Sequence, residues 1–144
     1  PIDVIKVADQ NSTDLDKAFN YLIERNIPAA NVVWATGRRM DHTITNLTNV
    51  VQFASQLKIV ILDDYSKVFL LPKQYKKWYP AETILSLIPI GTVNGISTIN
   101  LKYPLENESL TLGFRTGSSN SAQKDGVVEI SYKEGYLLLM ECFD

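Results

Sequence analysis

The chain contains one cysteine, one histidine and two methionines among its 144 residues, and it has no long hydrophobic run. With Cys142 alone, no internal disulfide can form, which excludes the disulfide frameworks of small secreted domains. No apolar stretch approaches the roughly 18 residues of a membrane-spanning helix, and the chain does not open on a secretory pattern. These absences predict a cytoplasmic protein with no membrane contact.

An excess of positive charge is also lacking. Lysine and arginine number 14 and aspartate and glutamate 16, so the formal net charge is −2 at pH 7. Nucleic-acid-binding domains usually carry a basic excess, and no nucleic acid partner is therefore expected. The sequence also has no Walker-type loop, no glycine-rich dinucleotide signature and no Cys/His metal pattern. Hydrophobic residues make up 45%, which suits one compact domain or two small domains sharing an interface.

The first half of the chain alternates strand-like and helix-like segments. Thr13 predicts the start of one helix, because Asp16 three residues later completes a capping-box pattern. A second helix is expected from about Asp41 to Leu57. Apolar, β-branched runs predict buried strands at residues 2–8, 31–36, 58–62 and 67–71. The alternation predicts an α/β fold with a parallel, Rossmann-like sheet and right-handed crossovers.

The second half consists of short apolar runs without a helical period. Residues 125–132 alternate in the manner of a strand, and Lys133 to Gly135 predict a hairpin that leads into the last run at 136–143. Several short strands at close spacing are typical of an antiparallel sandwich or barrel. We therefore expect an α/β half at residues 1–75 followed by an all-β sandwich at 76–144.

Polar residues follow two of the predicted parallel strands. Asp14 follows the first strand, and Arg38, Arg39 and Asp41 follow the second. Because ligands of open α/β sheets bind beyond the carboxyl ends of the strands, these side chains should converge on one crevice. Carboxylates suit Mg²⁺, and basic groups neutralise charge on a transferring phosphoryl group. The pattern indicates a possible metal-phosphate site.

Each of these residues also has a structural interpretation. Asp14 and Asp41 fall at helix starts, where the helix dipole alone favours a carboxylate. The two arginines are equally consistent with solvated loop charges, and the single histidine, His42, with a hydrogen-bonded structural role. Trp34 and Met40 are expected to be packing residues. Composition and spacing alone leave these alternatives open.

Four short motifs follow one another along the chain. A Thr-Asp pair is followed by lysine three residues later, with a glutamine upstream, and a Gly-x-Arg-x-Asp-His run is followed by an asparagine in the helix. In the second half, residues 95–105 read GISTINLKYPL, and a Ser-Asn pair lies in the late loop. The matching residues are Gln10, Thr13, Asp14 and Lys17, then Gly37, Arg39, Asp41, His42 and Asn46, then Ser119 and Asn120. Together these motifs resemble the thiamine pyrophosphokinase family.

The resemblance implies a transfer of the pyrophosphoryl group of ATP to the hydroxyethyl oxygen of thiamine, with thiamine diphosphate and AMP as products and Mg²⁺ as the required ion. It implies a homodimer in which the α/β half of one subunit and the sandwich of the other form the thiamine cleft. Residues 1–75 would then be the C-terminal part of the catalytic domain, and residues 76–144 the thiamine-binding domain.

The resemblance also implies roles for individual residues. Asp14 and Asp41 would be catalytic, with Asp14 holding the metal or orienting the thiamine hydroxyl. The implied substrate-binding residues are Gln10, Lys17, Arg39, His42, Asn46, Ser119 and Asn120. For Ser119 and Asn120, an ordinary polar turn remains the alternative, because both residue types favour turns.

The chain departs from the family pattern at three points. Arg38 stands at the position of a second glycine, and Asn100 at that of a glycine before Leu101, where a local change of turn is expected. The family's acidic Gly-Asp-x-Asp-Ser segment, which supplies metal ligands, is expected just upstream of Pro1 rather than within this chain. The resemblance therefore implies an enzyme of which this chain alone is an incomplete, inactive or nearly inactive part. The competing hypothesis is a non-catalytic module that binds a small molecule or dimerises.

Overall fold

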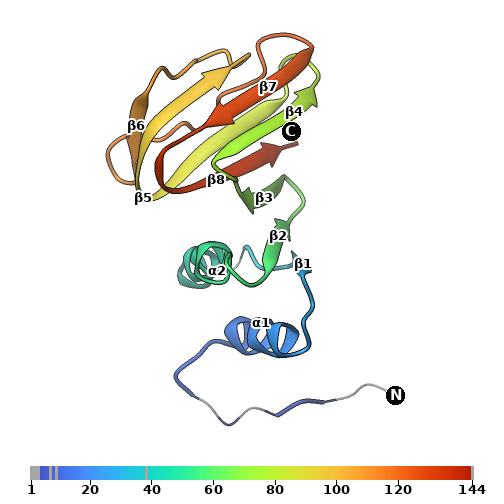
Figure 1. Ribbon diagram of the computed structural model, residues 1–144. Helices are drawn as coiled ribbons and strands as arrows, with labels where there is room; N and C mark the ends of the chain where they lie inside the picture. The colour runs from blue at the N-terminus through green and yellow to red at the C-terminus, as the bar shows by residue number, and fades with distance from the viewer. Residues whose placement is uncertain (1–3, 7, 9, 38, 144) are drawn as a thin grey trace.

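A computed structural model describes residues 4–6, 8, 10–37 and 39–143. Within these residues, two helices and the first strands form one end of the molecule, and the other end is a curled, mostly antiparallel sheet, called the sandwich below (Figure 1). The elements are α1 (Asp14–Glu24), β1 (Ala29–Val33), α2 (Met40–Gln52), β2 (Lys58–Leu62), β3 (Ser66–Leu70), β4 (Gln74–Tyr79), β5 (Ile84–Ile99), β6 (Glu108–Thr111), β7 (Gly126–Ser131) and β8 (Glu134–Cys142).

The first helix begins as the sequence predicts. The Thr13 hydroxyl accepts a hydrogen bond from the backbone N–H of Asp16 at 3.1 Å, and the Asp16 carboxylate accepts one from the Thr13 N–H at 2.8 Å. This reciprocal pair satisfies two of the N–H groups that a helix start leaves without partners. The capping box is therefore confirmed, and it involves Asp16 rather than Asp14.

The second helix is shorter than expected. It ends at Gln52, and turns at Phe53 to Gln56 replace its predicted last turn. Its inward side is formed by Val50 together with Phe53, whose ring meets that of Phe19 edge to face at 5.3 Å. Both helices therefore contribute to one apolar cluster.

The predicted parallel sheet is wrong beyond its first pair. In the part of the chain that the structure describes, only β1 and β2 run parallel, and the other strand pairs are antiparallel. Strand β3 follows β2 after Asp63 to Tyr65 alone, and a parallel crossover needs a dozen or more residues. The fold is thus mixed α/β with a mostly antiparallel sheet.

The strand predicted at residues 2–8 is not formed by its described members. Residues 4–6 and 8 have no strand conformation, and Ile2, Asp3 and Val7 lie outside the described residues. The side chains of Val4 and Ile5 are exposed, and β1 is paired with β2 alone. An apolar pattern indicates a tendency to be buried, but it does not provide the neighbouring strand that a ladder requires.

The hairpin predicted at Lys133–Gly135 is also wrong. Strands β7 and β8 both pair with β5 and are separated by it in the strand order. Strand β5 runs for 16 residues, and its register shifts near Gly91 and Gly95, which have φ angles of 75° and 69°. These bends let one strand join both sheets of the sandwich. The segment at 133–135 therefore passes from one sheet to the other.

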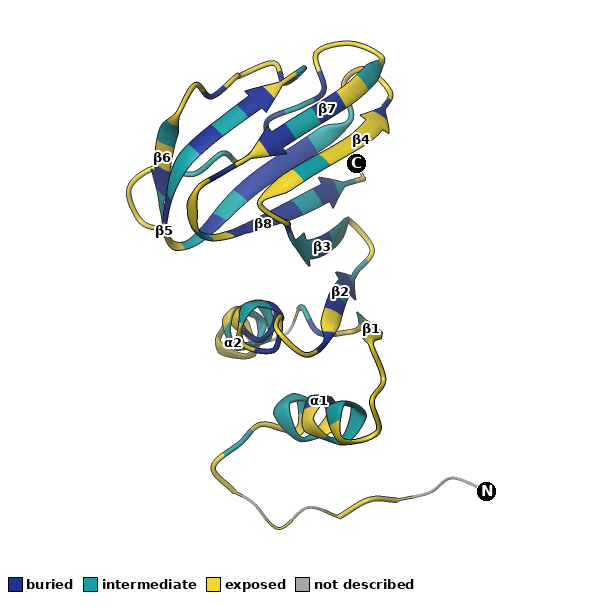
Figure 2. Ribbon diagram, viewed as in Figure 1, coloured by how far each residue is buried: buried dark blue, intermediate teal, exposed yellow. Residues whose placement is uncertain are grey.

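Strand β8 separates two hydrophobic cores. Leu137 and Leu139 belong to the sandwich interior, whereas Leu138 packs in the cluster that contains Phe19 and Phe53. Figure 2 shows the buried residues concentrated in the sandwich strands, while α1 is largely intermediate or exposed. Burial on both faces explains why the sequence of β8 is continuously apolar rather than alternating. No helix among the described residues has the length and apolar character needed to cross a membrane.

Candidate functional site

The loop between β1 and α2 is held from two directions. The side-chain amide of Asn46 in α2 donates to the carbonyl of Ala35 at 2.7 Å. The hydroxyl of Thr36 donates to Oδ2 of Asp63, at the end of β2, at 2.9 Å. Gly37 has a φ of 110°, a conformation that side-chain-bearing residues rarely adopt. The sequence thus places a constrained turn at the carboxyl end of a parallel strand, where ligands of such sheets bind.

Arg39 and Asp41 form a two-pronged ion pair at the start of α2. Nε of Arg39 donates to Oδ1 of Asp41 at 3.1 Å, and Nη2 donates to Oδ2. Both side chains are well exposed. The hydrogen bonds from Arg39 lower the pKa of Asp41 to about 2, so its carboxylate remains ionised across the physiological range. The pair presents a fixed guanidinium plane beside the loop.

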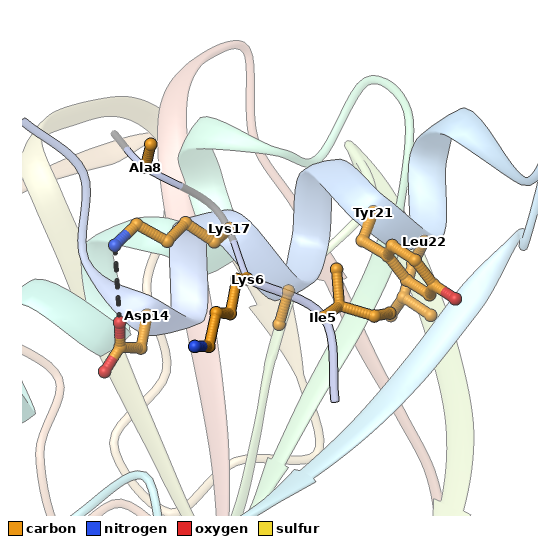
Figure 3. A pocket seen from close by; sticks show the side chains of 8 residues that line it. Ile5, Lys6, Ala8, Asp14, Lys17, Tyr21 and Leu22 are labelled. Carbon is orange, nitrogen blue, oxygen red and sulfur yellow. Dashed lines mark hydrogen bonds and ion pairs between the residues drawn. The ribbon is translucent and has the colours of Figure 1, made fainter. Parts of the chain in front are cut away.

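Asp14 is exposed near the start of α1, and the partly buried side chain of Lys17 reaches toward it from the next turn. Lys17 Nζ is 3.5 Å from Oδ1 of Asp14, whose carboxylate is fully exposed. Both residues line a hollow between α1 and the segment that contains Ile5 and Lys6 (Figure 3). Because Thr13 and Asp16 already cap this helix, the cap does not require the Asp14 side chain. This leaves the carboxylate available to a ligand.

Two adjoining hollows lie at the start of α2, and one of them extends to α1. One is lined by Asp14, His42 and Asn46, and the other by Arg39, His42 and Asn46. Of the residues predicted to converge, Asp14 and Arg39 therefore line separate but adjoining hollows, and Asp41 lines neither of them. Gln10 is exposed in the segment that precedes α1, and Arg38 lies outside the described residues. The arrangement provides a carboxylate, a guanidinium and an imidazole on one side of the molecule.

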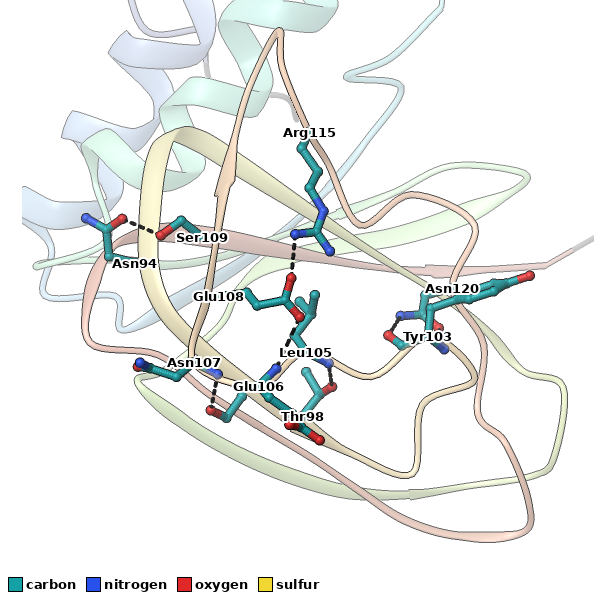
Figure 4. A network of polar contacts seen from close by, with 11 residues as sticks. Asn94, Thr98, Tyr103, Leu105, Glu106, Asn107, Glu108, Ser109, Arg115 and Asn120 are labelled. Carbon is teal, nitrogen blue, oxygen red and sulfur yellow. Dashed lines mark hydrogen bonds and ion pairs between the residues drawn. The ribbon is translucent and has the colours of Figure 1, made fainter.

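Ser119 and Asn120 lie in the sandwich, in the loop between β6 and β7. Asn120 is buried, and its Oδ1 accepts from the N–H groups of Tyr103 at 3.0 Å and Ser121 at 2.9 Å. Its Nδ2 donates to the carbonyl of Tyr103 at 2.8 Å, a clamp visible in Figure 4. Ser119 is exposed with a φ of 55°, and its N–H donates to the Ser86 hydroxyl. Neither residue lines the hollows around Asp14 and Arg39.

The prediction that Trp34 and Met40 are packing residues is wrong. The side chain of Trp34 is 94% exposed and that of Met40 is 70% exposed. Trp34 lines both hollows that contain His42 and Asn46. Trp34 directly follows a strand and precedes Gly37 by three residues. This position in the sequence could have predicted that it lies at the site rather than in the core. Asp63, to which the sequence assigned no role, likewise supports the loop.

The described residues do not form a complete metal site. No group of three or more His, Cys, Asp or Glu side chains among them is arranged to hold an ion. Mg²⁺ is often bound by only one or two carboxylates together with substrate phosphates. The fully exposed Asp14 carboxylate, which Lys17 contacts at one oxygen only, fits such a single ligand, whereas Arg39 binds both oxygens of Asp41.

Asn100 adopts the conformation expected of the glycine that it replaces in the motif. Its φ is 62°, and asparagine is among the few residues that visit this left-handed region routinely. Its side chain bonds both backbone groups of Lys124, with Nδ2 to the carbonyl at 3.0 Å and Oδ1 from the N–H at 3.2 Å. The asparagine thus fits a left-handed turn and ties it to the strand connection at Lys124.

Comparison with known proteins gives consistent matches in both halves. Residues 1–61 match the family model described as thiamin pyrophosphokinase, catalytic domain, and residues 71–137 match the thiamin pyrophosphokinase, vitamin B1 binding domain. Thiamine pyrophosphokinase 1 of Oryza sativa subsp. japonica is 33% identical over 132 residues, which cover 83% of this chain and 49% of that protein. Thiamin pyrophosphokinase 1 of Caenorhabditis elegans is 30% identical over 129 residues, covering 81% and 53%.

The crystal structure of thiamine pyrophosphokinase from Bacillus subtilis superposes with a TM-score of 0.82 at 25% identity. The match covers 95% of this chain and 65% of that one. The chain spans about half the length of the curated plant relatives that it matches.

Proposed function

Because this chain belongs to the thiamine pyrophosphokinase family, we propose that it acts in the transfer of a pyrophosphoryl group from ATP to the hydroxyethyl oxygen of thiamine. The products are thiamine diphosphate and AMP. The observation that carries the proposal is that matches to the catalytic and the vitamin-binding models occur in order on one chain. The convergence of Asp14, Arg39 and His42 around adjoining hollows supports it.

The charges around the hollows suit a polyphosphate. Arg39 presents two N–H groups to Asp41 and is well exposed, so its remaining donors can bind phosphate oxygens. Lys17 adds an ammonium on the same side of α1 as Asp14. Positive groups fixed around a transferring phosphoryl group stabilise the charge that it carries in the transition state. We assign Arg39 and Lys17 to the phosphates of ATP.

The two acids have different roles in this proposal. Asp41 is a poor proton acceptor, because Arg39 lowers its pKa to about 2, and it instead orients the guanidinium. Asp14 has an exposed carboxylate that orients the thiamine hydroxyl and would hold Mg²⁺. When bound with the phosphates, Mg²⁺ would supply additional positive charge. His42, Asn46 and Gln10 contact the substrates around these groups.

We also propose a homodimer with a shared site. Ser119 and Asn120 do not line the hollows around Asp14, so a second subunit would bring its sandwich to them. In this arrangement Ser119 contacts thiamine, and Asn120 holds the backbone of Tyr103 at the subsite. The division into a catalytic half at 1–75 and a thiamine-binding half at 76–144 belongs to the same proposal, as does a cytoplasmic location.

The test is a direct assay of both products. The protein, with any residues encoded upstream of Pro1 included, is incubated with thiamine, ATP and MgCl₂, and thiamine diphosphate and AMP are quantified together. We expect equal amounts of the two. Formation of ADP in place of AMP would contradict pyrophosphoryl transfer. If the affinity for thiamine is the same with and without ATP and MgCl₂, and no product forms, the chain is a non-catalytic binding module. The family matches do not favour this alternative.

A further inference from the structure

Trp34 occupies a position that folding alone does not explain. It directly follows β1 with a φ of 58°, and its side chain is 94% exposed. A bulky residue at positive φ is uncommon and strained, because its Cβ approaches the backbone. An exposed indole gains little packing in return. Strained residues of this kind cluster at sites of ligand binding, where the conformation aims the side chain.

The surroundings of Trp34 combine a flat apolar surface with phosphate-binding groups. It lines the hollow that contains Arg39 and Thr43 and also the hollow that contains Asp14. The Arg39 guanidinium offers N–H donors to an anion beside the indole. A ligand that carries both a flat heteroaromatic ring and phosphates fits these neighbours, and nucleotides have this composition.

We infer that Trp34 is the stacking surface for the base of the bound nucleotide. The indole face covers the purine, while Arg39 binds the phosphates of the same molecule. Aromatic side chains stack on bases through their faces, and this stacking tolerates differences between bases because each has a π-face. The inference rests on the proposed use of ATP, and it adds a residue outside the motifs that carry the family resemblance.

Fluorescence provides a direct readout, because the chain has only two tryptophans, Trp34 and Trp78. Trp78 lies on β4 in the sandwich, so Trp78→Phe leaves Trp34 as the reporter. We expect ATP to quench this emission and inorganic tripolyphosphate, which has no base, to leave it unchanged. Quenching by thiamine but not by ATP would overturn the inference.

Two substitutions separate ligand binding from folding. Glycine adopts positive φ without strain, so Trp34→Gly should keep or raise the melting temperature. We expect its affinity for ATP to fall roughly five- to a hundredfold, the equivalent of one stacked base, with tripolyphosphate affinity unchanged. Trp34→Phe, which keeps an aromatic face, should retain most of the ATP affinity.

The outcomes distinguish this inference from the proposed function. If Trp34→Gly binds ATP as tightly as the wild-type protein, the stacking role is overturned while ATP use stands. If the wild-type protein binds no ATP, both fail. If Trp34→Gly changes the oligomeric state seen by sedimentation but not the affinity for ATP, Trp34 is a contact between chains and the inference is overturned.

Discussion

The hydroxyl of Thr36 donates a hydrogen bond to the carboxylate of Asp63 across the ends of two parallel strands, at 2.9 Å. The other oxygen of Asp63 accepts from the N–H groups of Tyr65 at 2.9 Å and Ser66 at 2.7 Å. A single carboxylate therefore joins the loop after β1 to the turn after β2. The loop carries Arg39 into α2, so the position of the guanidinium depends on Asp63.

Replacement of the two partners should give unequal losses of stability. Asp63→Ala removes a carboxylate that several donors share and should lower the free energy of unfolding by about 2–3 kcal/mol, whereas Thr36→Val removes one bond and should lower it by about 1 kcal/mol. Urea denaturation measures both. Equal losses would show that the turn at Tyr65 does not depend on Asp63.

The contribution of Asp63 should also depend on pH. Burial alone would raise its pKa, but hydrogen bonds from the Tyr65 N–H, the Ser66 hydroxyl and Thr36 hold the pKa below its ordinary value. A lowered pKa contributes stability above the ordinary value near 3.9, and this stability is lost as pH falls through the folded-state value. The difference in unfolding free energy between the wild type and Asp63→Asn should therefore shrink in acid below about pH 4. A constant difference down to pH 2 would contradict this linkage.

Arg39 controls the ionisation of Asp41. Removal of the guanidinium in Arg39→Ala takes away the hydrogen bonds that lower the Asp41 pKa to about 2, so the pKa should return toward the ordinary range near 3.9. Carboxyl ¹³C chemical shifts followed from pH 6 to pH 1.5 measure this change. Arg39→Lys is the matched control, and it should give an intermediate pKa because an ammonium does not reproduce the planar fork. An unchanged Asp41 pKa in both variants would exclude the ion pair in solution.

Substitutions at Thr13 and Asp14 should affect different properties, helix stability and turnover respectively. Thr13→Ala breaks the capping box and should lower the free energy of unfolding by about 1 kcal/mol while leaving the carboxylate of Asp14 in place. Asp14→Asn keeps the cap and should leave stability nearly unchanged, with a large loss of turnover. Thermal unfolding and the product assay are measured on both variants. Turnover retained by Asp14→Asn would remove this residue from the catalytic site.

Asn120 and Ser119 should also differ, although they are neighbours. Asn120→Ala leaves the N–H and carbonyl of Tyr103 without their buried partner, so the free energy of unfolding should fall by about 2–4 kcal/mol. Ser119→Gly removes a side chain from a left-handed position and should be neutral or stabilise by up to about 1 kcal/mol. Denaturant midpoints compare the two. A stable Asn120→Ala variant with weaker thiamine binding would assign Asn120 to the ligand instead of the fold.

The sequence determined those features that depend on nearby residues. The cap at Thr13 and Asp16 follows from spacing along one helical turn, and most strands follow from apolar runs that must be buried. The sequence also predicted that the starts of both helices lie near each other, and Asp14 does share a hollow with His42 and Asn46, although no strand forms among the described residues before α1. Local chemistry is sufficient for such features.

Only the tertiary structure decided which segments became neighbours. Nothing in the sequence of β7 or β8 indicates that β5 separates them, because pairing depends on how far one long strand bends at Gly91 and Gly95. The same holds for Trp34, since an aromatic residue after a strand can be buried or exposed, and its φ of 58° turned it outward. Side-chain identity sets the tendency to be buried, and the path of the backbone sets whether a partner is present.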